Sequence, residues 1–179
     1  MRRRGVFLDL NGTLVMPLKP ERLEEMTLIA GAAEAVARLS AAGFVCPVVT
    51  VQSRIGKGIF SREEFEAWFA AFAAGLQAQG AIVVGPYVCP HRLADPCDCK
   101  KPNRLLYERA ASDHGIDAAE SFVIGDSPED VRAARLLGAR GCLVRTGWAA
   151  DREVMEKGLP DASVVVESIV QAVDWILVQ

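Results

Sequence analysis

Acidic side chains occur at the ends of two apolar runs that lie far apart in the sequence. Asp9 lies near the end of residues 5–10, and Asp126 directly follows residues 121–125, with Asp130 four positions further on. Parallel strands bring such carboxyl ends to one edge of a sheet, where ligands bind in open α/β folds. Three carboxylates at that edge would repel one another unless a cation lies among them. Carboxylate oxygens suit Mg²⁺, so this pattern predicts a magnesium site.

A hydroxyl and a lysine complete a set of groups suited to phosphoryl transfer. Thr50 lies at the end of the apolar run over residues 44–51, and Lys101 lies in a loop before a predicted helix. The expected site would therefore combine a carboxylate nucleophile, a divalent cation, a hydroxyl and a positive charge. This combination can attack, polarise and hold a phosphoryl group.

Four soft or borderline metal ligands occur within a single loop. Cys89, His91, Cys97 and Cys99 form the pattern C-x-H-x5-C-x-C. In a cytosolic protein such a cluster favours metal over disulfide bonds. The set suits a closed, tetrahedral structural Zn²⁺ site, which would leave no open position for a catalytic water. The alternative is a loop in which the cysteines occur by chance.

Strands and helices are predicted to alternate along the chain. We expect strands over residues 5–10, 44–51, 81–88, 121–125, 142–144 and 163–166. Helices are expected over residues 30–42, 61–79, 103–114 and 128–137, with a terminal helix through residue 177. Residues 15–28, 54–60 and 89–102 are expected to be loops. Alternation of this kind predicts a Rossmann-like α/β fold, a parallel sheet with helices on both faces.

Length and composition limit the possible classes of protein. The 179 residues suit one domain over residues 1–179, without an insertion large enough for a cap domain. A formal net charge of −3 gives no general attraction to nucleic acid, so we expect no nucleic-acid partner. No apolar run approaches membrane-spanning length, and residues 5–10 are too short for a signal-peptide core. We therefore expect a cytoplasmic protein that does not bind membranes, and by default a monomer.

Taken together, four ordered motifs resemble those of the haloacid dehalogenase (HAD) superfamily of phosphohydrolases. They are Asp9-Leu10-Asn11-Gly12-Thr13, Thr50, Lys101 and Gly125-Asp126-Ser127-Pro128-Glu129-Asp130. The resemblance implies that Asp9 attacks phosphorus and becomes an aspartyl-phosphate, while Thr50 and Lys101 hold the phosphoryl group. It also implies that Mg²⁺ is bound by Asp9, the carbonyl of Asn11 and Asp126, with Asp130 in support.

The cysteine loop resembles that of two compact HAD subfamilies, the heptose bisphosphate phosphatases and the histidinol phosphatases. Residues 49–60 look more like the heptose type, because Thr50, Gln52 and Ser53 match its usual T-N-Q-S segment. This resemblance implies a small phosphorylated metabolite as substrate, most plausibly a heptose bisphosphate, with histidinol phosphate as the alternative. Gln52, Ser53, Arg54 and Lys57 are then substrate-binding candidates, although an exposed basic loop explains Arg54 and Lys57 equally well.

Three residues depart from the pattern of these phosphatases. Asn11 stands where they usually carry an aspartate that protonates the leaving oxygen and then activates water. An amide can do neither, and general acid–base catalysis typically contributes roughly 10²–10⁴-fold. Val51 replaces a polar residue, and Lys100 replaces an arginine, keeping its charge toward a phosphate but losing bidentate geometry. The chain is therefore expected to be a slow phosphatase, a variant made to trap substrate, or a catalytically silent phosphosugar-binding protein.

Overall fold

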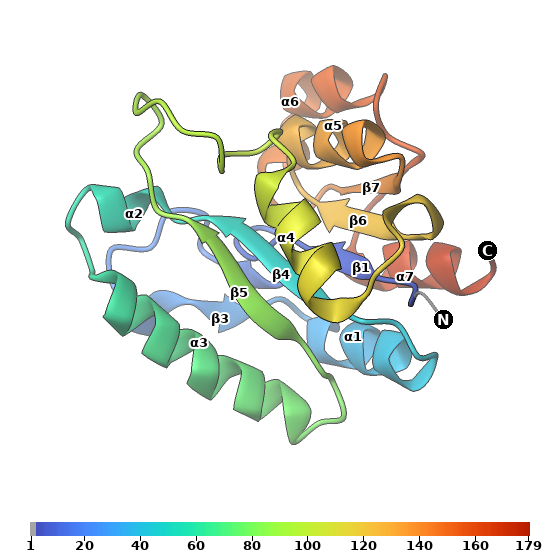
Figure 1. The fold of residues 1–179 in the computed structure, drawn as a ribbon, viewed down its shortest axis with the longest axis horizontal. Helices are drawn as coiled ribbons and strands as arrows, with labels where there is room; N and C mark the ends of the chain where they lie inside the picture. The colour runs from blue at the N-terminus through green and yellow to red at the C-terminus, as the bar shows by residue number, and fades with distance from the viewer. Residues whose placement is uncertain (1–2) are drawn as a thin grey trace.

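A six-stranded parallel sheet forms the centre of the computed structural model, which describes residues 3–179 (Figure 1). The first two residues of the predicted domain lie outside the described residues. The strands are β1 (Val6–Leu8), β4 (Pro47–Val51), β5 (Val84–Cys89), β6 (Phe122–Gly125), β7 (Arg140–Val144) and β8 (Val164–Val166). Their order across the sheet is β5-β4-β1-β6-β7-β8. The parallel sheet predicted from the alternating pattern is thus confirmed.

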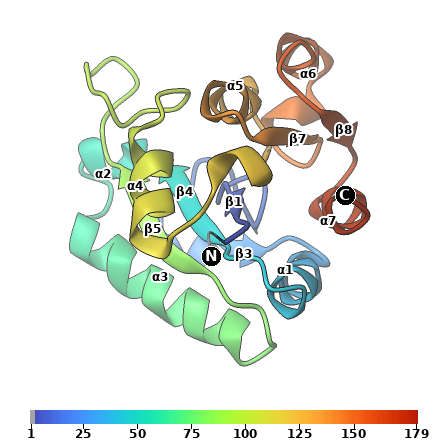
Figure 2. The ribbon, with the colours of Figure 1, turned by 45° about the vertical axis from the view of Figure 1, so that its right-hand side comes forward.

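Helices cover both faces of this sheet, as Figure 2 shows. The main helices are α1 (Ala32–Ala41), α3 (Arg62–Gln77), α4 (Leu105–His114), α5 (Pro128–Leu137), α6 (Arg152–Gly158) and α7 (Ile169–Leu177). Helices α1, α3 and α7 lie on one face, whereas α4 and α5 lie on the other. Within the described residues, no helix is long and apolar enough to cross a membrane.

The two-residue alternation of the strands explains this layering. In β1, Val6 and Leu8 pack into the core beneath α1, α3 and α7, whereas Phe7 packs against α4 and α5. In β6, Ile124 packs on the face with α1, α3 and α7, and Val123 packs on the face with α4 and α5. Successive side chains of a strand point to opposite faces, so a strand covered on both sides must be apolar throughout. That is why these strands appear in the sequence as continuous apolar runs.

Two predicted loops were wrong. Residues 15–28 contain the antiparallel pair β2 (Val15–Met16) and β3 (Thr27–Leu28), together with the short helix η1 (Leu23–Glu25). Strands of two residues are too short for an alternating pattern to be seen in the sequence. Residues 54–60, expected to be a flexible loop, begin within the short helix α2 (Ser53–Gly56). Helix α6 was not predicted either, although Asp151 caps it by accepting a hydrogen bond from the N–H of Val154.

The order of the strands determines where a site can form. From β1 the chain builds outward through β4 to β5, and then returns to place β6 on the other side of β1. The carboxyl ends of β1 and β6 are therefore adjacent at the point where the strand order reverses. Crevices at such switch points are the usual ligand sites of open α/β sheets. Asp9 follows β1 at this point, and Asp126 follows β6.

Helix α3 should depend on its buried aromatic residues for attachment to the sheet. Phe65 is fully buried and stacks on Phe60 with ring centroids 6.2 Å apart. Replacement Phe65→Ala should lower the free energy of unfolding by about 3–5 kcal/mol, because a buried ring is lost and a cavity remains. Urea unfolding would measure the change, with Ile82→Ala, an exposed residue, as a control expected within about 0.5 kcal/mol of the wild type. A loss below 1 kcal/mol at Phe65 would show that the helix does not depend on this ring.

Candidate active site

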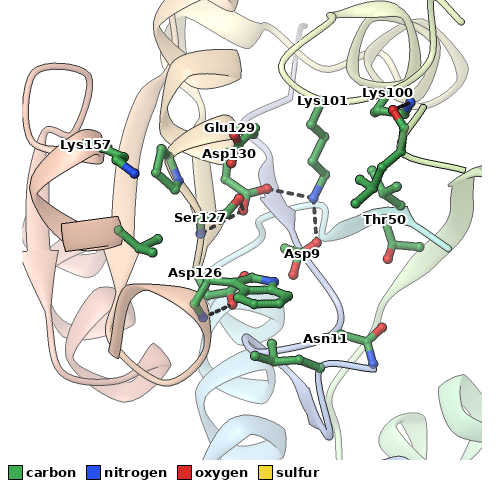
Figure 3. Close-up of a pocket in the computed structure, with 16 residues that line it drawn as sticks. Asp9, Asn11, Thr50, Lys100, Lys101, Asp126, Ser127, Glu129, Asp130 and Lys157 are labelled. Atoms are coloured by element: carbon green, nitrogen blue, oxygen red, sulfur yellow. Dashed lines mark hydrogen bonds and ion pairs between the residues drawn. The ribbon is translucent and has the colours of Figure 1, made fainter. Parts of the chain in front are cut away.

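Three carboxylates meet at the carboxyl edge of the sheet, as predicted from the strand ends. Asp9, Asp126 and Asp130 each place an oxygen within 4.8 Å of the others (Figure 3). Asp9 and Asp126 come from the ends of β1 and β6, and Asp130 comes from the first turn of α5. All three are buried, at the base of a cavity of about 490 Å³. The topology thus brings together groups that are 121 residues apart in the chain (Asp9 to Asp130).

Lys101 holds two of these carboxylates by direct ion pairs. Its ammonium lies 2.6 Å from Asp9 Oδ1 and 2.7 Å from Asp130 Oδ1 (Figure 3). Burial alone would lower the pKa of Lys101, but the negative charges of Asp130 and Asp9 hold that pKa well above its ordinary value. The lysine is therefore a fixed positive charge beside the expected nucleophile.

Three further hydrogen bonds fix the orientation of Asp130 and Asp126. Asp130 Oδ2 accepts hydrogen bonds from Ser127 Oγ at 2.6 Å and from the Ser127 N–H at 3.2 Å, so Asp130 also caps α5. Asp126 Oδ2 accepts a hydrogen bond of 2.6 Å from the N–H of Trp148. A Cβ atom at Gly12 or Gly147 would collide with the Asp126 carboxylate, so the backbone approaches this group at two places where a side chain would not fit.

The electrostatics of the cluster fit a divalent cation. Burial, with a smaller contribution from the charge of Asp130, raises the pKa of Asp9 to about 6 against the lowering effect of Lys101. Burial and the neighbouring charges of Asp9 and Asp130 raise the pKa of Asp126 well above its ordinary value. One lysine does not balance three buried carboxylates, so a cation bound among their oxygens would remove this penalty. Mg²⁺ matches the donor set, since it is bound through few carboxylates and completes its shell with water and phosphate oxygens.

Thr50 and Asn11 are joined by the side chain of Gln52. The Gln52 amide nitrogen donates to Asn11 Oδ1 at 2.8 Å and to Thr50 Oγ1 at 2.9 Å. Gln52 is buried and does not line the cavity, whereas Thr50 and Asn11 do. In this arrangement Gln52 positions its two neighbours, and its direct contact with a substrate stays a prediction.

Four residues predicted to contact substrate, Ser53, Arg54, Lys57 and Lys100, differ in their position relative to the cavity. Arg54 forms an ion pair of 2.6 Å with Glu21, and Lys57 is exposed just after α2. Lys100 lines the cavity, but its ammonium donates to the carbonyls of Arg92, Leu93 and Asp95 at 2.7–3.0 Å. Ser53 begins α2 and does not line the cavity. The structure therefore shows Lys100 bracing the cysteine loop, and a role of these four residues in substrate binding stays a prediction.

The cysteine loop brings its four predicted ligands together. One ligand atom from each of Cys89, His91, Cys97 and Cys99 lies within 4.8 Å of the others. The Sγ atoms of Cys89 and Cys97 are 3.8 Å apart, and His91 Nδ1 lies 3.7 Å from Cys89 Sγ. Two thiolates on a tetrahedral zinc, at about 2.3 Å each, would be about 3.8 Å apart. The geometry thus suits Zn²⁺ in a closed site, with Cys89 at the end of β5 beside the strand that carries Thr50.

Several residues of the cavity were not predicted as site residues. Trp148 holds Asp126 through its backbone N–H, and Leu18 and Val154 line the cavity. Tyr107 does not line the cavity but is buried near Lys101, whose charge partly offsets the rise that burial causes in the pKa of the Tyr107 hydroxyl. The local signal that could have identified Trp148 is the preceding Gly147. A glycine allows the backbone to approach the Asp126 carboxylate closely.

Comparison with known proteins agrees with this geometry. A family model described as HAD-hydrolase-like matches residues 98–172. The D-glycero-beta-D-manno-heptose-1,7-bisphosphate 7-phosphatase of Haemophilus ducreyi is 32% identical, over 98% of this chain and all of that protein. The chain belongs to the HAD-like phosphatases. A corresponding enzyme of Thermosynechococcus vestitus is 34% identical over 98% of this chain and 96% of its own length.

A solved structure extends the likeness to three dimensions. The D,D-heptose 1,7-bisphosphate phosphatase of B. bronchiseptica, complexed with magnesium and phosphate, superposes with a TM-score of 0.88. The two are 28% identical, and the match covers 97% of this chain and 98% of that one. The HAD-like fold that we expected for this chain from the four motifs is therefore confirmed.

Asp9 should make the stability of the metal-free protein depend on pH. The folded state binds the Asp9 proton more tightly than the unfolded state, with pKa values of about 6 and 3.8. Its contribution to stability is therefore present below pH 4 and is lost as the pH rises through 6, by on the order of 1–3 kcal/mol. Asp9→Asn should remove this loss and make the metal-free variant more stable than the wild type at pH 8. Chemical unfolding across pH 4–8, with chelator present, measures the difference.

The control for that measurement is Glu153→Gln, which removes one unit of charge from an exposed position on α6. It should follow the wild type at every pH. A variant Asp9→Asn that is less stable than the wild type at pH 8 would show that the ion pair with Lys101 outweighs the cost of burial.

The reactivity of the thiols should report on the cysteine loop. Burial raises the pKa of Cys46 and of Cys142 to about 12, so neither should react with a thiol reagent in the folded protein. In zinc-loaded protein we expect no fast-reacting thiol. Chelation should make Cys97 and Cys99 react quickly and the buried Cys89 slowly, while denaturant should expose all five cysteines. Fast reaction of Cys97 and Cys99 in zinc-loaded protein would contradict a site that uses all four ligands.

Proposed function

We propose that this chain is a Mg²⁺-dependent phosphomonoesterase that acts through Asp9 and folds as one HAD-like domain over its length. The observation that carries the proposal is the placement of Asp9, which lies at the base of the cavity and is bonded to Lys101. Its carboxylate lies within 4.8 Å of Asp126 and Asp130. Such a cluster combines a nucleophile, a fixed positive charge and a cation site at one point.

In the proposed mechanism each residue has one task. The Asp9 oxygen that does not face Lys101 attacks phosphorus, and the ester bond to the leaving oxygen breaks. Thr50 and Lys101 bind the oxygens of the transferred phosphoryl group. Asp9, the Asn11 carbonyl and Asp126, with Asp130 in support, would hold Mg²⁺, which would supply positive charge beside the phosphoryl oxygens. Water then releases phosphate from Asp9.

The zinc loop has a structural task in this proposal. A closed Cys₃His site offers no position for a reacting water, so its ion cross-links the loop. Lys100 and Lys101 directly follow the last ligand, Cys99. A rigid loop therefore helps to keep the Lys101 ammonium between Asp9 and Asp130.

A heptose bisphosphate is the leading candidate substrate. Its support is the name of the curated relatives, which match this chain over nearly its whole length, and of the magnesium-bound structure. Gln52, Ser53, Arg54, Lys57 and Lys100 stay candidates for contact with such a substrate. Histidinol phosphate is the alternative substrate within the same class of reaction, because the cysteine loop of this chain also resembles that of the histidinol phosphatases.

A second function, phosphosugar binding without turnover, is favoured by Asn11. The amide lines the cavity where an acid–base group would be needed, and its oxygen accepts a hydrogen bond from Gln52. Without a proton donor or base, both ester cleavage and hydrolysis of the aspartyl-phosphate slow down. The cation site would remain, because residue 11 contributes its backbone carbonyl.

Phosphate release from heptose 1,7-bisphosphate with Mg²⁺ distinguishes the two functions. We expect slow release by the wild type, a rate higher by roughly 10²–10⁴-fold for Asn11→Asp, and none for Asp9→Ala. Release by Asn11→Asp alone would favour the binding protein. Equal rates for the wild type and Asn11→Asp would show that another group serves as acid and base, and activity of Asp9→Ala would refute the mechanism.

A further inference from the structure

The amide of Asn11 is bonded on both of its polar sides. Its nitrogen donates to the Pro17 carbonyl at 2.8 Å and contacts Met26 Sδ at 3.4 Å, while its oxygen accepts from Gln52 at 2.8 Å. The surroundings therefore match a group that donates on one side and accepts on the other. A carboxylate in the same pose would place an oxygen against the Pro17 carbonyl, so this position is suited to an amide.

Two lysines of the cavity, Lys100 and Lys101, already donate hydrogen bonds within the protein. These bonds leave no free proton beside the oxygen that leaves with the organic part of the substrate. The three N–H groups of the Lys100 ammonium can each donate one bond, and three backbone carbonyls accept them. Lys101 donates to Asp9 and Asp130. Asp126 accepts the Trp148 N–H and belongs to the expected cation site, and the remaining titratable residues of the cavity lining, Glu129 and Lys157, are exposed on α5 and α6. The leaving group must therefore depart without help from a buried acid.

Departure without protonation selects for acidic leaving groups. The oxygen that leaves takes the electron pair of the broken bond, and a phenol tolerates that charge far better than an aliphatic alcohol does. Phenol resembles the tyrosine side chain, whose pKa is about 10. Proton donation in the transition state is worth roughly 10²–10⁴-fold, and an alkyl ester loses that benefit here.

Apolar side chains form part of the cavity wall. Leu18, Val51, Leu93, Trp148 and Val154 come from five different segments and all line the cavity. Trp148 is 41% exposed and Leu93 is 77% exposed, which places large apolar side chains at the mouth. A polyhydroxylated sugar needs polar partners for its hydroxyl groups, whereas these side chains suit a flat hydrophobic ring.

We propose that this site favours aryl phosphates, monoesters whose leaving oxygen is phenolic and whose organic part is an aromatic ring. The inference rests on the proposed phosphatase reaction, and it names a substrate class other than the heptose bisphosphate that the names of the relatives suggest. Under it, an alkyl ester such as a heptose phosphate is turned over slowly, because its leaving oxygen needs the missing proton.

The steps balance without a further reactant. Asp9 donates an electron pair to phosphorus, the ester P–O bond breaks, and its pair leaves on the aryloxide, which takes a proton from solvent. Water then attacks the aspartyl-phosphate, the P–O bond to Asp9 breaks, and the carboxylate is restored. Both protons of that water remain on the released dihydrogen phosphate.

Phenyl and benzyl phosphate test the inference, since both carry one ring and differ in the acidity of the leaving oxygen. In wild-type protein with Mg²⁺, kcat/KM for phenyl phosphate should exceed that for benzyl phosphate by about 10²-fold or more. Asn11→Asp should narrow this ratio at least tenfold, mainly by raising the rate with benzyl phosphate. Asn11→Ser, which removes the amide without adding an acid, should keep the wild-type ratio.

Each outcome separates the inference from the proposed function. A wild-type ratio near one, with no activity in Asp9→Asn, would overturn the inference and leave the phosphatase mechanism in place. Phenyl phosphate turnover that survives in Asp9→Asn would refute the mechanism. Inactivity of the wild type on both esters, with phosphate release from heptose 1,7-bisphosphate by the same protein, would overturn the inference alone. Inactivity on all three esters would overturn the proposed function as well.

The apolar wall has its own test. Leu18→Ser should raise KM for phenyl phosphate at least threefold more than KM for acetyl phosphate, which has an acidic leaving group and no ring. Ile82→Ser, an exposed residue before β5 and at the opposite end of that strand from Cys89, is the control. Equal increases for both substrates with Leu18→Ser would show that the wall does not recognise the ring.

Discussion

The excess of buried negative charge at the switch point of the sheet is the constraint on which the rest of the structure depends. Asp9, Asp126 and Asp130 share this edge, and Lys101 is the cation bonded to two of them. A protein tolerates such a cluster only where each charge has partners, because burial in low dielectric disfavours every unpaired ion. The surrounding elements can be understood as the means of supplying those partners.

Each partner is delivered by a different element of the fold. The N-terminus of α5 supplies Ser127 to Asp130, and the segment after β7 supplies the Trp148 N–H to Asp126. Glycines at positions 12 and 147 allow two backbone segments to close around the Asp126 carboxylate. The sheet core behind them is apolar on both faces and fixes the strand ends. Stability therefore comes from the strands, while function is placed where the strands end.

Much of this arrangement was predictable from the sequence, and the failures have physical causes. Strands buried on both faces are visible as apolar runs. These runs placed Asp9 and Asp126 at strand ends and led to the correct prediction of a parallel sheet covered by helices on both faces. The helix expected to begin at residue 61 does so, because Ser61 and Glu64 form a capping box, which is a local pattern of the sequence. The pair β2–β3 was missed because its pairing joins residues 15–16 to residues 27–28, with only two residues in each strand.

The sequence also could not predict which acceptors the long basic side chains contact. The sequence shows that Lys100 and Arg54 are near the site, but not which acceptors their flexible side chains reach. Arg54 reaches Glu21, and Lys100 reaches three carbonyls of the loop before it. Because the acceptor at position 93 is a backbone carbonyl, the Leu93 side chain can change without loss of its bond to Lys100. The tip of this loop can thus vary to suit a new ligand, through Leu93 at the mouth, while the neighbouring Lys101 stays in register.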